Sequence, residues 1–401
     1  FNYGSLPVYI LRGVSQILEI ISQKSIANYD GMLYIGRTLS LLNDIVVIIF
    51  IYKIAKLLFG KKEVALFASF FYVFAFFPIQ NTHFFIVDTY LNLFGTLLIY
   101  TVLTYLKKPS LFKLFILGVI FAAAITTKVT AILFAPVIGL ALLFANTGSW
   151  LQKIVPTLLQ GLLLVCITLI FSFLCMPYGF IHFEQFMDEI SLQLKMNSDP
   201  YIFPYTLQYV GTLPYWYYIK NIAIWGLGPF IFGFFLLGVY EHAIQFKFAV
   251  LKKWFKQHQK EISIFIIFYL FYILYFLIIG KSAVKFMRYM LIMYPFFAII
   301  AGYGAYEGFK SLKGLQKKWI MGICFAFIML WTLAFINIYT TKTTRIQATE
   351  WIYTYIPEGS TLAVEHWDDR IPVFDPGKYM YEELTLYDIP DNDLKWQILN
   401  E

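Results

Sequence analysis

The sequence predicts an all-α polytopic membrane protein with a small α/β segment at its C-terminal end. The 401-residue chain is 60% hydrophobic and has a mean hydropathy of +0.68. Its apolar residues form about ten segments, most of which match the ~20 residues that a helix needs to cross ~30 Å of hydrocarbon. We expect these transmembrane helices over residues 38–58, 63–81, 86–106, 111–127, 129–145, 153–175, 221–240, 262–279, 288–306 and 319–339.

Lysines are concentrated on alternate connections between these segments, and this pattern predicts the orientation. The positive-inside rule places the lysine-rich connections in the cytoplasm. These connections hold 17 lysines and lie at 52–62, 107–113, 146–153, 241–261 and 307–318. The net charge of +7 is then mostly a topology signal, so we expect contact with membrane lipids and no binding of nucleic acid. The sequence thus predicts a multi-pass protein of the plasma membrane.

The same pattern divides the chain into three parts. Residues 1–37 form an amphipathic segment on the exoplasmic side, and residues 38–339 form the transmembrane domain, with a long outer loop at 176–220. Residues 340–401 carry 12 of the 24 acidic residues, together with turn sequences between short apolar runs. We therefore expect a small exoplasmic C-terminal domain, or the stub of a larger one. Because the chain starts without methionine, we also expect a helix and a loop to precede Phe1.

The turn between the second and third predicted spans holds the first candidate site residues. Asp88 would lie at or just inside the membrane boundary, where a carboxylate costs free energy unless it is paired or faces a wet cavity. His83 lies five residues earlier in the same turn. Asp88 could instead serve only as the N-cap of a helix beginning at Thr89.

Cations on the side that is otherwise poor in lysine form the second candidate group. Lys128 stands between two apolar segments, where it either reaches the interface or offers a cation to an anionic ligand. Lys281, Lys285 and Arg288 break the charge pattern, and they either bind an anion or pair with the acidic tail. Arg288 suits phosphate best, because its guanidinium is always charged and can bind bidentately.

The predicted outer loop contributes a group of aromatic residues. Such residues form an interfacial belt, or they line a groove in which a sugar packs its C–H faces against the rings. The candidates for this sugar or acceptor groove are Tyr205, Tyr209, Tyr215 and Trp216.

Several short motifs, in their order and on their predicted side of the membrane, resemble the GT-C glycosyltransferases. The closest resemblance is to family 39, the protein mannosyltransferase-like branch, which is also similar to the aminoarabinose transferase of lipid A. The motifs are Gly36-Arg37-Thr38-Leu39-Ser40, Leu58-Phe59-Gly60-Lys61-Lys62, Thr82-His83-Phe84, Val87-Asp88-Thr89, Thr126-Thr127-Lys128 and Arg288-Tyr289-Met290-Leu291.

This resemblance implies an enzyme that transfers a glycosyl group, with inversion, from a polyprenyl-phosphate-linked sugar to an acceptor hydroxyl on the exoplasmic face. Asp88 matches the acidic residue of the family's second outer loop, and the main general base would precede Phe1. The candidates for stabilising the leaving lipid phosphate are Lys128, Lys281, Lys285, Arg288 and Arg37. No cofactor is implied with certainty, and a divalent cation stays open. The acceptor is a protein, a glycan or a lipid.

Two other functions fit the same residues. A transporter or flippase for a lipid-linked or anionic substrate would also place cations on the outer face, although transporters often show repeated halves and the chain has no convincing internal repeat. The chain could also be a structural subunit without activity. The sequence does not identify the sugar, the acceptor or the oligomeric state.

Overall fold

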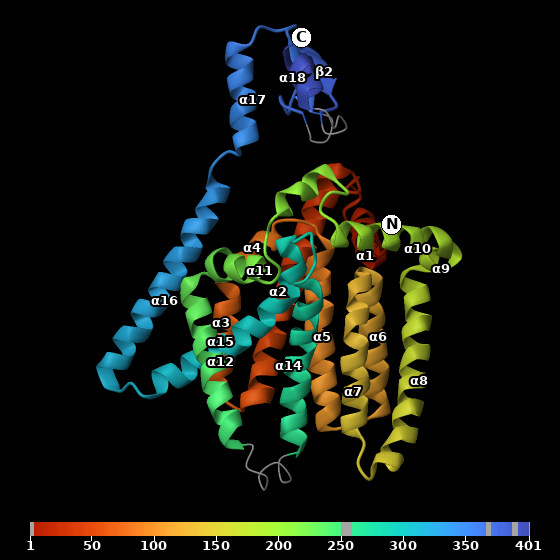
Figure 1. Ribbon diagram of the computed structural model, residues 1–401, viewed down its shortest axis with the longest axis vertical. Helices are drawn as coiled ribbons and strands as arrows, with labels where there is room; N and C mark the ends of the chain where they lie inside the picture. Colours follow the sequence, from red (N-terminus) through yellow and green to blue (C-terminus); the bar gives the residue numbers. More distant parts are fainter. Residues whose placement is uncertain (1–3, 250–258, 366–369, 387–391, 401) are drawn as a thin grey trace. The chain divides into compact units, whose positions relative to one another are not determined.

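The computed structural model describes residues 4–249, 259–365, 370–386 and 392–400 (Figure 1). The chain divides into two compact units, Phe1–Thr332 and Leu333–Glu401, and the boundary falls within the last long helix. The predicted lysine-rich connection at 241–261 includes residues 250–258, which lie outside the described part.

Most described residues of the first unit are helical, and none of them forms a strand. Its α-helices are α1 (Leu6–Ser22), α2 (Tyr29–Phe59), α3 (Lys62–Val73), α4 (Phe76–Thr82), α5 (Val87–Lys107), α6 (Leu111–Thr127), α7 (Ala135–Ala145), α8 (Trp150–Cys175), α9 (Pro177–Ile181), α10 (Phe183–Ser198), α11 (Trp216–Asn221), α12 (Pro229–Ala249), α14 (Gln259–Ile279), α15 (Tyr294–Lys310) and α16 (Gly314–Ile336). Its short 3₁₀ segments are η1 (Val129–Phe134), η2 (Pro204–Tyr209) and η4 (Met287–Met293), and η3 (Ile222–Gly226) is a π-helical turn. The 3₁₀ segment η5 (Asn337–Thr340) follows α16 in the second unit.

Among the described residues, five helices are long and apolar enough to cross a membrane, or six if the bent pair α3 and α4 is one span. The five are Val87–Lys107, Trp150–Cys175, Lys260–Ile279, Met287–Lys310 and Gly314–Tyr355. A mostly helical protein with several apolar helices is therefore what the structure shows, and the expectation of about ten spans is not confirmed.

Several predicted spans begin, end or break at other residues. Helix α2 begins at Tyr29, nine residues before the predicted 38, because the Asn28 side chain accepts a hydrogen bond from Gly31 N and caps the helix there. The predicted span at 63–81 breaks between α3 and α4 with a bend of 56°. The predicted outer loop at 176–220 is not an open loop, because it contains α9, α10, η2 and most of α11.

Helix α15 packs in the middle of the bundle, between α3 and α12. Two glycines permit this packing. A Cβ at Gly302 would lie 2.6 Å from Ala68 N of α3, and one at Gly304 would lie 2.1 Å from Phe234 O of α12. Small residues let helix backbones approach closely where apolar burial drives association weakly. Substitution at either glycine would push α15 away from its neighbours.

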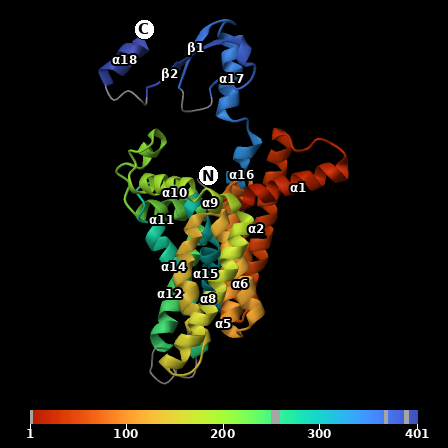
Figure 2. The same ribbon diagram turned by 90° about the vertical axis from the view of Figure 1, so that its right-hand side faces the viewer.

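Helices α9 and α10 lie at one end of this bundle, which we call the α10 end, and α1 crosses beside it (Figure 2). The chain before α1 is held there by Gly4, whose N–H donates to Thr127 O at 3.1 Å. A Cβ at Gly4 would lie 1.7 Å from Thr126 O, so only glycine fits against the C-terminal turn of α6.

The second unit contains both α and β structure in its described residues. Strands β1 (Thr361–Glu365) and β2 (Met380–Leu384) form a two-stranded parallel sheet in which Thr361 pairs with Met380. Helices α17 (Thr344–Tyr355) and α18 (Asn392–Asn400) precede and follow the strands in the chain. The Tyr379 hydroxyl donates to Ile356 O at 3.0 Å and ties the sheet to the end of α17.

Candidate active site

Asp88 lies in the first turn of α5 and is 2% exposed. The helix begins at Val87 with Ile86 as its N-cap, and no side chain caps it, so the alternative that Asp88 caps a helix beginning at Thr89 is wrong. The carboxylate instead accepts a hydrogen bond from Lys128 Nζ, with 2.7 Å between Nζ and Oδ1. A negative charge in the first turn is also favoured by the helix dipole.

Lys128 reaches Asp88 because α6 ends directly before it. Its backbone is extended, with φ −154° and ψ 124°, and the 3₁₀ segment η1 follows. The hydroxyls of Thr126 and Thr127 donate to carbonyls of the preceding turn, those of Ala122 and Ala123. The break turns the Lys128 side chain into the bundle, where the residue is 7% exposed.

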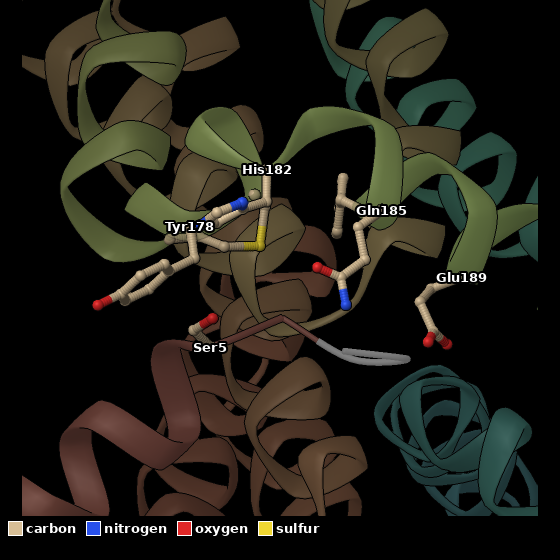
Figure 3. A pocket seen from close by; sticks show the side chains of 8 residues that line it. Ser5, Tyr178, His182, Gln185 and Glu189 are labelled. Atoms are coloured by element: carbon tan, nitrogen blue, oxygen red, sulfur yellow. The ribbon is translucent and has the colours of Figure 1, made fainter.

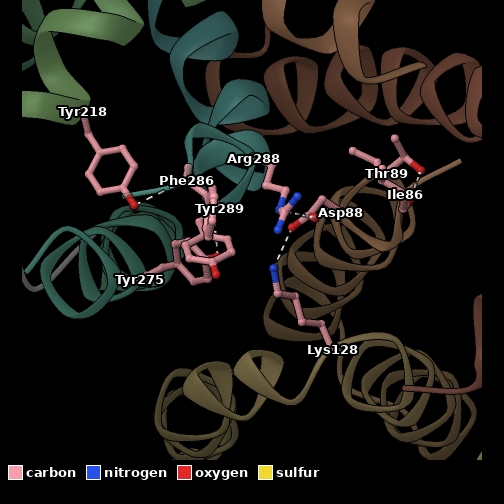
Figure 4. A network of polar contacts seen from close by, with 9 residues as sticks. All are labelled: Ile86, Asp88, Thr89, Lys128, Tyr218, Tyr275, Phe286, Arg288 and Tyr289. Carbon is pink, nitrogen blue, oxygen red and sulfur yellow. Dashed lines mark hydrogen bonds and ion pairs between the residues drawn. The ribbon is translucent and has the colours of Figure 1, made fainter. Parts of the chain in front are cut away.

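Arg288 brings a second cation to the same carboxylate from η4. Its Nε lies 4.0 Å from Asp88 Oδ2, and its side chain is 38% exposed (Figure 4). The guanidinium also lies 4.6 Å from the centre of the Phe286 ring. Two cations therefore face one carboxylate in the Asp88 cluster, defined here as Asp88, Lys128, Arg288 and Tyr289.

Tyr289 covers Lys128 from the η4 side, with the ammonium 4.3 Å from the ring centre. The Tyr275 hydroxyl of α14 donates to Tyr289 O at 2.8 Å and fixes this part of η4. A cation over an aromatic face is stabilised by about 0.5–2 kcal/mol. The ring therefore helps to keep the ammonium in place without neutralising it.

A cavity of about 350 Å³ opens beside Lys128 and Tyr289. Its walls come from η1, α10 and the last turns of α14, and they are mostly apolar. They are formed by Lys128, Val129, Thr130, Ile132, Leu133, Ile190, Gln193, Leu194, Asn197, Tyr275, Ile278, Ile279, Ser282 and Tyr289. The cavity thus combines mostly apolar walls with one buried cation, the ammonium of Lys128.

A second, much smaller pocket lies along the preceding turns of α10, with room for about 20 Å³ (Figure 3). Polar side chains of His182, Gln185 and Glu189 gather there, with Tyr178 of α9 and Ser5 before α1. A pocket of this size holds about one water molecule or one hydroxyl group. Sequence reasoning missed α10 altogether, although its spacing of polar and apolar residues is that of an amphipathic helix.

The other residues predicted for phosphate binding lie in different settings. Arg37 is exposed on α2, and Lys281 is exposed in the turn after α14. Lys285 is 2% exposed and donates from Nζ to Ala283 O at 2.9 Å; burial lowers the pKa of this ammonium. Of the predicted cations, then, the structure brings Lys128 and Arg288 to Asp88. His83 is exposed after α4, where its Nδ1 lies 2.7 Å from Ile79 O.

The predicted aromatic groove is divided. Tyr205 and Tyr209 lie 6.3 and 5.5 Å from the ring of Phe286, which carries Arg288 on its face. Burial raises the pKa of Tyr209 to about 12. Tyr215 instead donates to Leu277 O of α14 at 3.0 Å, and Trp216 is 58% exposed at the start of α11. Two of the four aromatic residues thus adjoin the Asp88 cluster.

Within the described ranges, no group of three or more histidine, cysteine, aspartate or glutamate side chains could hold a metal ion. The divalent cation left open by the sequence therefore finds no cluster of such ligands in this part of the chain.

Two comparisons with known proteins give matches. Residues 33–172 match the profile of the dolichyl-phosphate-mannose-protein mannosyltransferase family. The structure is similar to the crystal structure of ArnT from Cupriavidus metallidurans bound to undecaprenyl phosphate, with a TM-score of 0.51 and 14% sequence identity. The match covers 88% of this chain and 58% of the ArnT chain, so the chain spans less than two thirds of that protein. No curated protein sequence matches.

These findings confirm the resemblance to the GT-C glycosyltransferases that the sequence motifs indicate. The matched profile covers most of α2, the helices that follow it and most of α8, and it includes Asp88 and Lys128. The similarity to ArnT is one of fold.

Proposed function

We propose, on the premise of this GT-C resemblance, that the chain transfers a glycosyl group from a polyprenyl-phosphate-linked sugar to an acceptor hydroxyl, with inversion, on the exoplasmic side of the membrane. The observation that carries the proposal is the position of Lys128. Its ammonium lies between the carboxylate of Asp88 and a cavity with apolar walls. A lipid phosphate needs both features, because its chain requires apolar contact and its head requires a cation.

The cavity supports binding of the lipid part of the donor. Its volume of about 350 Å³ is at the lower end of the ~300–1,000 Å³ typical of small-molecule sites. Isoprene units would pack against Ile132, Leu133 and Ile278, and the phosphate would lie at the Lys128 end. The two cations of the Asp88 cluster, Lys128 and Arg288, favour the phosphate there.

The chemical step is a substitution at the anomeric carbon. The bond from this carbon to the phosphate oxygen breaks, the bond to the acceptor oxygen forms, and the acceptor proton passes to a carboxylate. The lipid phosphate leaves with added negative charge, and Lys128 and Arg288 stabilise that charge. Asp88 holds the two cations in place and is the carboxylate of this cluster. The resemblance places the main base before Phe1.

The test uses the full-length protein in lipid bilayers with a panel of radiolabelled polyprenyl-phosphate sugars and membrane extract as the source of acceptors. The expected result is release of lipid phosphate together with transfer of label to an acceptor, which identifies both substrates. Saturable movement of labelled lipid between leaflets without turnover would contradict the proposal and favour a transporter or flippase.

A further inference from the structure

Two polar side chains of the cavity at Lys128 have an atom without a hydrogen-bond partner. Within the described part of the chain, Thr130 Oγ1 and Asn197 Oδ1 are buried and bond to no other group. Both residues line this cavity, Thr130 from η1 and Asn197 from the C-terminal turn of α10. A buried polar group without a partner costs free energy, so valine or leucine would suit a wall that meets only hydrocarbon. The two side chains therefore point to an occupant with polar groups of its own.

The backbone around Lys128 explains why the Thr130 hydroxyl is unpaired. Thr126 and Thr127 lie in α6, and their hydroxyls donate to carbonyls of the preceding turn. The chain is extended at Lys128, so Thr130 follows a break in the helix, and its hydroxyl bonds to no carbonyl of the described residues. A change of χ1 between staggered rotamers turns such a hydroxyl toward an occupant of the cavity. The hydroxyl is therefore available to a bound group.

Asn197 is held beside the cavity by its backbone. Its carbonyl oxygen accepts a hydrogen bond from Ala283 N at 2.8 Å, which joins the end of α10 to the turn after α14. The side-chain oxygen Oδ1 can only accept. The oxygens of a lipid phosphate are acceptors too, and an isoprene chain carries no donor, so neither of them pairs with Oδ1. The missing partner is a group with an O–H or N–H.

We propose that Thr130 and Asn197 form a subsite for the sugar of the lipid-linked donor, in which Asn197 Oδ1 accepts from one sugar hydroxyl and the Thr130 hydroxyl pairs with another. This inference rests on the proposed function, because it takes the occupant to be a polyprenyl-phosphate-linked sugar. The sugar is joined to the phosphate, so it lies within reach of residues that share a cavity with Lys128. A site built to bond a hydroxyl discriminates strongly against a ligand that lacks it. The two residues would then set the choice of sugar.

The experiment measures binding to the full-length protein in bilayers, with sugar-free polyprenyl phosphate and with the panel of polyprenyl-phosphate sugars. We expect wild-type protein to bind at least one sugar-bearing lipid about tenfold more tightly than the sugar-free lipid, equivalent to ~1.4 kcal/mol. The double variant Thr130→Val with Asn197→Leu should lose this preference and keep wild-type affinity for the sugar-free lipid. Its unfolding temperature without lipid should equal or exceed the wild-type value, because two unpaired polar groups are removed.

Thr101→Val and Asn221→Leu are the matched controls. The Thr101 hydroxyl donates to Leu97 O at 2.8 Å. Asn221 Nδ2 donates to Tyr217 O at 2.7 Å, and neither Thr101 nor Asn221 lines the cavity. Each control loses a hydrogen bond, so it should lower the unfolding temperature and leave the preference for the sugar-bearing lipid unchanged.

The outcomes separate this subsite from the proposed transfer reaction. Equal affinity of wild-type protein for every lipid of the set would overturn the subsite and leave the cavity as a site for lipid phosphate. A preference that survives in the double variant would also overturn it. If wild-type protein bound none of these lipids, the donor cavity would fall together with the subsite. A preference that the double variant loses, without sugar transfer by wild-type protein, would support the subsite and contradict the transferase.

Discussion

Asp44 of α2 and Asp88 of α5 are both almost fully buried, at 8% and 2% exposure, but their partners differ in charge. Asp88 faces Lys128 and Arg288. Asp44 accepts a hydrogen bond from the Tyr72 hydroxyl at 2.7 Å, and Tyr72 in turn accepts one from Asn92 Nδ2 at 2.7 Å. Among the residues that the structure describes, no ion pair includes Asp44.

The two arrangements share helix α5, because Asn92 follows Asp88 by four residues and so lies one turn further along the same face. One turn of helix thus separates a charged pair beside a cavity from a network of neutral donors in the bundle interior. Only the first arrangement offers cations to an anionic substrate. The second supports packing between α2, α3 and α5, and we expect the variants below to separate the two roles.

The largest effect is expected from Asp88→Asn, which keeps the shape of the side chain and removes its charge. Transfer should fall by ~10²–10⁴-fold, the range of a general acid–base or charge-positioning group. The rate is measured with the donor panel and full-length protein. Asp30→Asn is the control, because Asp30 also lies in the first turn of a helix but is exposed. A wild-type rate of transfer in the Asp88→Asn variant would mean that Asp88 has a structural role only.

Lys128→Met should be the most destabilising of the charge variants. It leaves the buried Asp88 carboxylate without its partner at 2.7 Å, and breaking a buried ion pair costs ~3–5 kcal/mol. Thermal unfolding in detergent measures the loss. The double variant Asp88→Asn with Lys128→Met removes both charges and should regain part of that stability. If the stability losses of the two single variants simply added up in the double variant, Asp88 and Lys128 would not be energetically coupled. That result would contradict the ion pair that their distance indicates.

Arg288→Lys should weaken donor binding without unfolding the protein. The guanidinium lies at the edge of the cluster, 4.0 Å from the carboxylate and 38% exposed, so its loss leaves no fully buried charge unpaired. We expect KM for the lipid-linked donor to rise about tenfold, equivalent to ~1.4 kcal/mol, because a lysine cannot bind phosphate bidentately. Arg37→Lys is the control on an exposed arginine. Unchanged kinetics in Arg288→Lys would remove this residue from the phosphate site.

Asp44→Leu should lower stability and leave transfer unchanged, the reverse of the Asp88 result. It leaves the buried Tyr72 hydroxyl without its acceptor, at a cost of ~1–3 kcal/mol. Asp44→Asn keeps an oxygen for Tyr72 and should cost less. Unfolding temperature and transfer rate are measured side by side. A large loss of transfer in Asp44→Asn would mean that the interior network takes part in the reaction.

The smallest effect is expected at Lys285, and it depends on pH. Burial lowers the pKa of its ammonium in the folded protein below the ordinary 10.5, so the unfolded chain binds more protons between the two values. Stability contributed by this group therefore rises with pH up to about 10.5. Lys285→Met should remove that rise and increase the unfolding temperature at pH 7. Thermal melts at pH 7 and 9.5 test this, and an identical pH dependence in wild type and variant would contradict it.

Much of the fold follows from local sequence properties. Long apolar runs predict helices because a buried backbone must satisfy its own hydrogen bonds, and α5, α6 and α8 lie close to the predicted ranges. The predicted helix bounds are wrong where a capping side chain or a bend in the backbone sets the end of a helix. The cap at Asn28 extends α2, the break near Ala75 divides the second span, and α10 runs across the end of the bundle where a loop is predicted.

The sequence by itself determined the helical class and the GT-C resemblance, and it placed Asp88, Lys128 and Arg288 among the candidate site residues. Only the tertiary structure decided that these three meet, because they are separated by 40 and 160 residues and come together through the packing of α5, α6 and η4. It also decided that Lys281 and Arg37 are exposed and that Asp44 is buried with neutral partners. The spacing of residue types predicts which face of a helix is apolar, but contacts between distant segments depend on how every helix packs at once.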